Sequence, residues 1–454
     1  MAGTTTLEQR SIDYVPAAER HGRPRSLMFL WFAANTSITA VVTGALFVVV
    51  GNTALWSIPA IIIGNLFGAF FTSLHSVQGP KLGVPQMIQS RAQFGYLGAI
   101  LPLVLALLIY IGFYATGLVL GGQAIARLFH IPQQLGAALF ALCSTALAIF
   151  GYRHIHRYSH LAAVLSGVVF LGLFIRILTD PASGSMLSDH TFAGAPFILG
   201  ISLSASWQLT FGPYVADYSR YLPENTSPRA TFGWTFAGSV LGGSLAMTLG
   251  ALAAGLGGKA FMSNEVGYLA DLGGIFSVVV LLAVICGKLT GNTLSSYGGY
   301  MSAATIVTSL TRGAEVRPRH RVIYIGLISL VSLLIALSAT DSFLTSFTNF
   351  LLFLLYFIVP WSAINLVDFY WVRHEQYDID DLFRPDGAYG RWNVRALTAY
   401  VIGVLVQIPF MNSSVYVGPI ADLMGGAELS WVLGLVVSGG LYYLMTTTTR
   451  TVKA

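Results

Sequence analysis

The chain has 454 residues, of which 55% are hydrophobic and only 9% charged, with a mean hydropathy of +0.70 and a formal net charge of +5. Soluble domains carry about 25% charged residues, so this composition excludes a soluble protein and indicates an integral membrane protein. The cysteines Cys143 and Cys286 stand in apolar runs, which excludes a disulfide framework. The apolar runs are unbroken, whereas a membrane β-barrel needs short alternating segments, so we expect an all-α fold.

A helix needs about 20 apolar residues to cross the hydrocarbon layer of a membrane. Runs of this kind predict twelve transmembrane helices. In chain order they cover residues 28–50, 55–78, 97–126, 133–151, 158–179, 195–215, 230–256, 272–308, 321–340, 343–366, 393–411 and 428–447.

The positive charges fall unequally on the two sides of these spans. Of the 24 Lys and Arg residues, only Arg127, Arg176 and Lys259 lie on one side, and Lys288 lies within a span. All the others lie on the side that holds both termini. Because Lys and Arg accumulate on the cytoplasmic side of a membrane, we predict a multi-pass protein of the cytoplasmic (inner) membrane with both termini inside.

Two of the predicted spans contain polar residues where lipid favours apolar ones. The first carries Asn35, Thr36 and Ser37 in its middle, and the sixth carries Ser206-Trp207-Gln208 shortly before Gly212-Pro213. Hydroxyl groups often bond back to their own helix, so the amides of Asn35 and Gln208 are the stronger candidates for lining a cavity. Interrupted helices five spans apart predict two inverted five-helix halves followed by two additional helices.

One formal charge lies deep inside the eighth predicted span. A bare ammonium at that depth costs about 2.5 to 3.5 kcal/mol even on a lenient insertion scale, so Lys288 is expected to face a wet cavity. No Asp or Glu lies in the interior of any predicted span to neutralise it. Asn292 follows one turn later and therefore shares its helical face.

Several familiar catalytic patterns are missing. The chain has no phosphate-binding glycine loop and no HExxH pair, and its spans offer no carboxylate and histidine to activate a hydroxyl. We therefore expect neither an enzyme nor a cofactor. The histidines between Tyr152 and His160 stand among arginines and indicate a cytoplasmic helix end rather than a metal site. The polar stretch Arg373 to Trp392 is expected to be a solvated loop.

Four stretches, spread over nearly the whole chain, resemble nucleobase–cation symporters of the purine–cytosine permease type. They are Trp31-Phe-Ala-Ala-Asn35, the run from Gly79 to Gly95, Tyr214-Val-Ala-Asp217-Tyr-Ser-Arg220-Tyr-Leu-Pro223, and Pro360-Trp361 with Asp368-Phe-Tyr370. The resemblance implies a five-plus-five inverted-repeat fold with alternating access. The expected organisation is a cytoplasmic segment (1–27), a transport core (28–366), a cytoplasmic loop (367–392), two additional helices (393–447) and a cytoplasmic tail (448–454).

The resemblance also implies roles for individual residues. Phe113 corresponds to the aromatic side chain that stacks on the base, Tyr110 replaces an amide-bearing residue, and Asn292 matches the asparagine that reads the base edge. The sixth span supplies the unwound stretch. A planar heterocycle needs such a stacking face, worth roughly 1 to 3 kcal/mol per base, and amides for its edge. The expected substrate-binding residues are Asn35, Ser37, Tyr110, Phe113, Ser206, Trp207, Gln208 and Asn292.

For the coupling ion, the resemblance implies a sodium site made by carbonyls of Ala33 and Thr36 and the hydroxyl of Thr290. A second hydroxyl position is Gly291 here, and a further ligand position is Gly287. Our hypothesis is that Lys288, whose pKa burial would shift readily, replaces the sodium ion and makes the protein proton-coupled. A fixed structural cation, a hydrogen-bond donor to substrate, a position nearer water and sodium coupling remain alternatives.

The expected function is a secondary active importer (symporter) of a nucleobase, cytosine or a purine by preference, driven by a cation gradient. An importer of hydantoin, allantoin or a vitamin-like heterocycle is an alternative on the same scaffold, and a passive channel or facilitator is an alternative of another class. The expected partners are a small planar heterocycle, the lipid bilayer and co-transported H⁺ (or Na⁺), and no nucleic acid.

Overall fold

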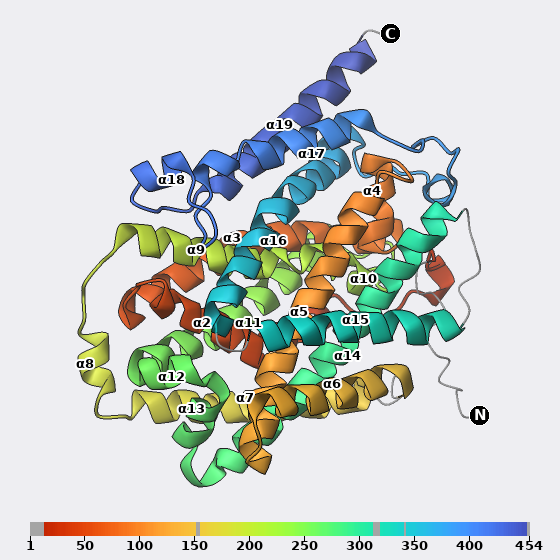
Figure 1. The fold of residues 1–454 in the computed structure, drawn as a ribbon. Coiled ribbons are helices and arrows are strands. Elements are labelled where there is room, and N and C mark those ends of the chain that lie inside the picture. Colours follow the sequence, from red (N-terminus) through yellow and green to blue (C-terminus); the bar gives the residue numbers. More distant parts are fainter. Residues whose placement is uncertain (1–12, 151–154, 312–317, 340–341, 452–454) are drawn as a thin grey trace.

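The computed structural model describes residues 13–150, 155–311, 318–339 and 342–451, and in these ranges the fold is built from helices (Figure 1). Helix is present in every one of the twelve expected spans. In chain order the helices are α1 (Ser26–Asn35) with α2 (Ile38–Val49), α3 (Ala54–Leu82), α5 (Ile100–Phe129), α6 (Gln133–Phe150), α7 (Ile155–Leu178), α9 (Gly194–Leu209) with α10 (Gly212–Ser219), α11 (Pro228–Gly257), α14 (Ser277–Leu310), α15 (Pro318–Ser338), α16 (Phe343–Val367), α17 (Val394–Leu405) and α19 (Ser430–Thr451).

Not all of these helices satisfy the requirements for a membrane span on their own. Among the described residues, eight helices are long and apolar enough to cross a membrane, and the bent pair α1 and α2 makes up to nine. The expected spans that fall short are α6 and α17, which are shorter apolar helices, and the interrupted pair α9 and α10. The structure thus supports an all-α membrane protein with eight to nine clear spans.

The predicted interruption of the first span is confirmed. Helix α1 ends at Asn35, Thr36 leaves the helical conformation, and the axis of α2 is bent by 56° from that of α1. Ser37 is extended, and its hydroxyl accepts a hydrogen bond from the backbone N–H of Ala40 (3.3 Å). Serine is a favoured N-cap because it satisfies a free amide of the first turn, so this residue starts the second half of the span.

The interruption of the sixth span is smaller and later than expected. Ser206, Trp207 and Gln208 form the last turn of α9 instead of an unwound stretch. Only Thr210 and Phe211 separate α9 from α10, and both keep right-handed helical backbone angles. Pro213 lies in the first turn of α10, where its missing N–H costs no hydrogen bond. The proline therefore starts a new helix after a local turn.

Five short helices lie in the connections: α4 (Gln86–Phe94), α8 (Ser183–Leu187), α12 (Lys259–Ser263), α13 (Glu265–Leu272) and α18 (Pro419–Leu423). The apolar runs of the sequence did not predict these short helices. Helix α4 falls in the expected loop between the second and third spans, yet all nine of its residues are buried. This connection is therefore part of the protein core.

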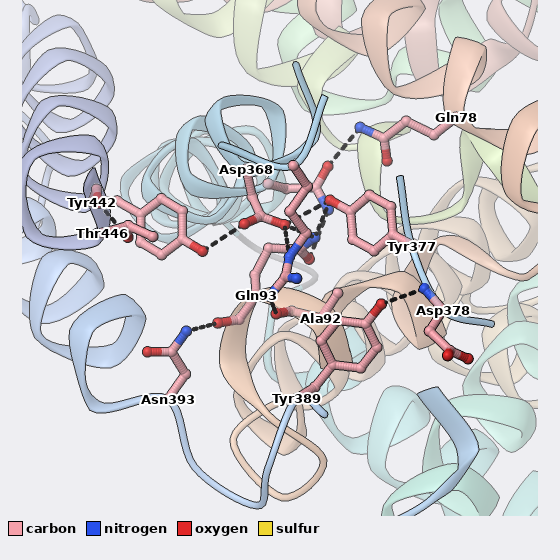
Figure 2. Close-up of polar contacts among 12 residues, drawn as sticks. Gln78, Ala92, Gln93, Asp368, Tyr377, Asp378, Tyr389, Asn393, Tyr442 and Thr446 are labelled. Carbon is pink, nitrogen blue, oxygen red and sulfur yellow. Dashed lines mark hydrogen bonds and ion pairs between the residues drawn. The ribbon is translucent and has the colours of Figure 1, made fainter. Parts of the chain in front are cut away.

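A buried carboxylate joins α4 to the C-terminal helices (Figure 2). Asp368, fully buried in the single π-helical turn that follows α16, accepts hydrogen bonds from the hydroxyls of Tyr442 (2.7 Å) and Tyr377 (2.6 Å). The side-chain amide of Gln93 on α4 donates to the same carboxylate (3.0 Å), and Arg373 pairs with it at 3.2 Å. Burying this charge is offset by four polar partners from three parts of the chain.

The expectation of a solvated loop between Arg373 and Trp392 needs correction. Most of its side chains are exposed or half-buried, but Leu382 is fully buried against α4. The guanidinium of Arg91 on α4 donates to the carbonyl of Leu382 (3.0 Å). The loop is thus anchored on the protein by α4, which the sequence pattern did not indicate.

Helices α2 and α11 cross with their backbones in close contact. A Cβ atom at Gly44 of α2 would overlap the backbone of Met247, and one at Gly250 of α11 would overlap the carbonyl of Val41. Small residues allow such approaches between helices in membranes, where packing rather than water drives association. These two glycines therefore set the distance between the broken first span and α11.

The first prediction concerns this crossing. Gly250→Ala should lower the melting temperature of the detergent-solubilised protein, because overpacking a close contact costs about 1 to 3 kcal/mol. Gly233→Ala in the same helix is the control, since no atom lies within 4 Å of the added methyl group, and alanine is the better helix former. Equal melting temperatures for both variants would contradict the close crossing.

The connection between α11 and α14 holds a second buried carboxylate. The side-chain amide of Gln123 at the end of α5 donates to Glu265 (2.6 Å), and its oxygen accepts from the backbone N–H of Val266 (3.2 Å). Glu265 is almost fully buried, and burial raises its pKa from the usual 4.5 to about 7. This pair ties α13 to α5.

The second prediction is a pH dependence of stability. Because the pKa of Glu265 is higher in the folded protein than in the unfolded chain, its contribution is complete below pH 4.5 and is lost as the pH rises through about 7. The loss is on the order of 3 kcal/mol. The melting temperature should therefore fall more between pH 5 and pH 8 in the wild type than in Glu265→Gln. Parallel pH profiles of the two proteins would refute the assignment.

Candidate functional site

Four aromatic side chains from three long helices and one turn meet near the centre of the protein. The ring of Phe113 on α5 contacts Trp207 on α9 (centroids 5.6 Å apart) and Phe350 on α16 (5.4 Å). Phe211, in the turn after α9, contacts Trp207 at 5.7 Å. All three contacts are nearly perpendicular, the edge-to-face arrangement that aromatic rings favour. These four residues are called the aromatic cluster below.

Two polar residues of α14, Lys288 and Asn292, lie beside α5 one turn beyond Phe113. Helix α14 packs along α5 more extensively than any other described pair of elements. A Cβ atom at Gly117 of α5 would overlap the side-chain oxygen of Asn292 and crowd the side chain of Lys288. Both α14 residues therefore face α5 at Gly117. This agrees with the prediction, made from their spacing, that they share one face of their helix. Since Phe113 and Gly117 are four residues apart, the polar pair neighbours the aromatic cluster.

Asn292 is fully buried and only half satisfied. Its amide nitrogen donates to the backbone carbonyl of Tyr114 (3.2 Å), whereas its side-chain oxygen has no hydrogen-bond partner among the described residues. A buried acceptor without a donor costs about 1 to 3 kcal/mol. The oxygen lies against Gly117 of α5 and is a buried acceptor that an N–H group would satisfy.

Lys288 is 7% exposed, and its ammonium donates to the hydroxyl of Thr39 (2.7 Å). Thr39 lies in the first turn of α2, so this hydrogen bond connects the eighth span with the second half of the broken first span. None of the ion pairs formed by the described residues includes Lys288. The ammonium thus lies among neutral groups, beside the helix break.

The hydroxyls at the expected sodium site donate their protons within their own helices, and their oxygen lone pairs remain available to a cation. The hydroxyl of Thr36 donates to Phe32 O (2.8 Å) and that of Thr290 to Cys286 O (3.2 Å), so both bond back to their own helix. Ala33 lies in the last turn of α1, where carbonyls lose their helical partners. Among the described residues no group of three His, Cys, Asp or Glu could hold a metal ion. The side chains of His154, His156 and His160 lie outside the description.

The side-chain amides of Asn35 and Gln208 are hydrogen-bonded to each other and not to Asn292. The side-chain oxygen of Asn35 accepts hydrogen bonds from the indole N–H of Trp207 (2.8 Å) and from the amide of Gln208 (3.1 Å). The same Gln208 nitrogen lies 2.6 Å from the side-chain oxygen of Asn65 on α3 and 3.0 Å from the carbonyl of Ser239 on α11. These amides are therefore engaged among α1, α3, α9 and α11.

The other expected site residues have packing or capping contacts. Tyr110 packs against Tyr214 of α10, with ring centroids 5.5 Å apart. The hydroxyl of Ser206 donates to the carbonyl of Leu351 on α16 (2.5 Å), and Ser37 caps α2. The structure thus brings Phe113 and Trp207 together, with Asn292 and Lys288 beside them.

Sequence reasoning missed four residues of this region: Thr39, Asn65, Gly117 and Ser239. Asn65 carried a usable signal, because it is an amide in the middle of an apolar run, as Asn35 is. A threonine, a serine and a glycine are common in membrane helices. Only the contacts with Lys288, Gln208 and Asn292 distinguish them from their neighbours.

Comparisons with known proteins agree with this architecture. Residues 14–434 match the family model described as permease for cytosine/purines, uracil, thiamine, allantoin. YxlA of Bacillus subtilis (strain 168), whose name assigns it provisionally to the purine-cytosine permeases, is 39% identical over 97% of this chain and 96% of its own length. The purine-cytosine permease fcyB of Emericella nidulans is 25% identical over 97% of this chain and 89% of its own.

The fold also matches a solved transporter structure. Mhp1, a nucleobase-cation-symport-1 family transporter solved in a closed conformation with bromovinylhydantoin bound, superimposes with a TM-score of 0.75 at 19% identity, over 98% of this chain and 96% of Mhp1. The family match and the 39% identity to YxlA extend over almost the whole chain. The chain belongs to the family of permeases for cytosine/purines, uracil, thiamine and allantoin, and it is a multi-pass membrane transport protein rather than an enzyme.

Proposed function

We propose that this protein is a secondary active importer (symporter) of a nucleobase, cytosine or a purine by preference. The observation that carries the proposal is the buried side-chain oxygen of Asn292 on α14, which has no hydrogen-bond partner among the described residues and lies beside α5, one turn from the aromatic cluster. Cytosine and the purines combine a flat ring with N–H groups at the edge. The ring suits Phe113 and Trp207, and an N–H suits the free oxygen. The printed names of YxlA and fcyB support the same substrate class.

The proposed coupling ion is a proton carried by Lys288. A Cβ atom at Gly291 would lie 4.0 Å from the ammonium nitrogen of Lys288. Gly291 is the position at which the family pattern supplies a second sodium-binding hydroxyl. With that hydroxyl replaced by glycine, the expected site keeps one of its two side-chain hydroxyls, that of Thr290, which donates its proton to Cys286 O and keeps lone pairs for a cation. Sodium held by carbonyls of Ala33 and Thr36 is the second candidate.

The position of the ammonium gives coupling a physical route. Lys288 donates to Thr39 in the first turn of α2, where the helix dipole is positive and disfavours a cation. Loss of the proton would weaken the hydrogen bond between α14 and α2, so protonation and the relative position of the two helices would be linked.

The architecture proposed for alternating access has two inverted five-helix halves, with α17 and α19 as additional helices and both termini in the cytoplasm. The breaks after α1 and after α9 support it, because they fall in the first and sixth spans. A hydantoin, allantoin or a vitamin-like heterocycle is a second substrate candidate. The bromovinylhydantoin bound to Mhp1 favours the hydantoins among these.

The third prediction tests substrate recognition. Asn292→Leu should raise the KM for labelled cytosine about tenfold in cells or proteoliposomes, because a buried hydrogen bond to the base edge is lost. Thr293→Val is the matched control, since the neighbouring hydroxyl bonds back to Leu289 O. Competition by unlabelled purines, uracil, hydantoin and allantoin would rank the substrates. An unchanged KM in Asn292→Leu would remove this residue from the site.

The fourth prediction tests the coupling ion in proteoliposomes. An inward proton gradient should drive accumulation by the wild type without sodium, whereas Lys288→Met should lose accumulation and keep exchange of internal for external substrate. Lys259→Met, at an exposed position in α12, should behave as the wild type. Sodium-dependent and pH-insensitive uptake in both the wild type and Lys288→Met would contradict proton coupling, and equilibration without accumulation would indicate a facilitator.

A further inference from the structure

Three fully buried amide side chains form a cluster inside the four helices α1, α3, α9 and α11. The amide cluster consists of Asn35, Asn65 and Gln208, together with the backbone carbonyl of Ser239. The nitrogen of Gln208 lies at its centre, between 2.6 and 3.1 Å from three oxygens. Unpaired polar groups at this depth in a membrane are costly, so the orientation of each amide matters.

The hydrogen-bond pattern of the cluster has one consistent arrangement. The nitrogens of Asn35 and Asn65 donate to carbonyls of their own helices, at Trp31 (2.9 Å) and Ile61 (3.0 Å), so their oxygens face Gln208. If the amide of Gln208 were flipped, its oxygen would meet three other oxygens and no donor. The nitrogen must therefore point inward, and the oxygen of Gln208 has no partner among the described residues.

Helix α11 supplies backbone rather than side chains at this point. A Cβ atom at Gly243 would lie 2.5 Å from the oxygen of Asn65 and 2.6 Å from the nitrogen of Gln208. A Cβ atom at Gly242 would lie 3.0 Å from the Cβ of Asn35. Since real Cβ atoms do not approach this closely, the glycine pair allows α11 to close over the amides.

The amide cluster is connected to the aromatic cluster by the hydrogen bond between Trp207 and Asn35. The oxygen of Asn35 accepts from Gln208 and from the indole N–H of Trp207, so both of its lone pairs are used. The indole N–H of Trp207 is thereby spent inside the protein, while its ring contacts Phe113 and Phe211. Trp207 can offer a bound heterocycle its ring but no hydrogen bond.

We propose that Asn65 is a positioning residue for substrate recognition: it holds Gln208, and Gln208 and Asn35 together fix the orientation of the Trp207 indole. This inference rests on the proposed function, in which Trp207 contributes to the stacking face. In this arrangement, two different parts of the protein recognise the ring and the edge of the base. The side of α9 supplies an oriented aromatic surface, and the hydrogen bonds to the base edge come from elsewhere, with Asn292 on α14 as the available acceptor.

The first test compares transport kinetics. Asn65→Leu removes the acceptor for Gln208 at similar volume and should raise the KM for cytosine about fivefold or more, with surface abundance and maximal rate changed less than about twofold. Ser244→Ala in the same helix is the control, because Ser244 lies outside the amide cluster and its hydroxyl has no hydrogen-bond partner among the described residues; its KM should be unchanged. A loss confined to abundance or maximal rate would overturn the positioning role. Asn65→Ser is the second variant if Asn65→Leu does not fold.

A double-mutant cycle tests whether Asn65 acts through Trp207. Trp207→Phe keeps an aromatic ring and removes the N–H that bonds to Asn35. In that background Asn65→Leu should raise the KM less than about twofold, because coupled residues are not additive. An equal increase in both backgrounds would show that Asn65 acts by another route and would refute the proposal.

A measurement without substrate separates this inference from the proposed function. The emission of Trp207 is obtained from purified proteins as the difference between the wild type and Trp207→Phe. The same difference spectrum, measured in the Asn65→Leu background, should be shifted, because the indole loses its fixed hydrogen bond. In the Ser244→Ala background it should be unchanged. An unshifted spectrum in Asn65→Leu overturns the inference. If the wild type transports none of the tested heterocycles, the proposed function fails while this measurement still decides the role of Asn65.

Discussion

The side-chain oxygen of Asn35 is the acceptor on which the buried polar centre of this protein depends. Within a bilayer no water is available to satisfy a polar group, so each donor needs a partner from the protein. Asn35 provides one at the end of α1, where the helix breaks, for both Trp207 and Gln208. The break in the first span and the last turn of α9 are thus held together by one carbonyl group.

Helix α5, which runs through the middle of the protein (Figure 1), contacts α9, α14 and α16. Phe113 contacts α9 and α16, and Gly117, one turn later, provides the space into which Asn292 and Lys288 of α14 pack. The aromatic cluster, the side-chain oxygen of Asn292 and the side chain of Lys288 therefore all contact one face of α5. A movement of α14 relative to α2 would change the Lys288 to Thr39 hydrogen bond and the surroundings of Asn292 together.

The connections between spans contribute more to the fold than their length suggests. Helix α4 is buried along its whole length and bonds through Gln93 to the carboxylate of Asp368, which also binds Tyr442 of α19 (Figure 2). At another connection, Gln123 of α5 holds Glu265 of α13. The four polar partners of Asp368 offset the cost of burying its charge. Glu265 accepts from Gln123, and burial nevertheless raises its pKa.

The sequence by itself determined the all-α membrane fold, the approximate positions of the long helices, an interruption in the first span and the burial of Lys288. These features follow from apolar length, helix-breaking residues and local charge, which are read along one segment at a time. Tertiary structure decided what each polar side chain contacts. Gln208 donates to Asn35 and Asn65, Lys288 donates to Thr39, and the expected loop at α4 is core, because hydrogen-bond partners depend on which distant helix packs against a residue.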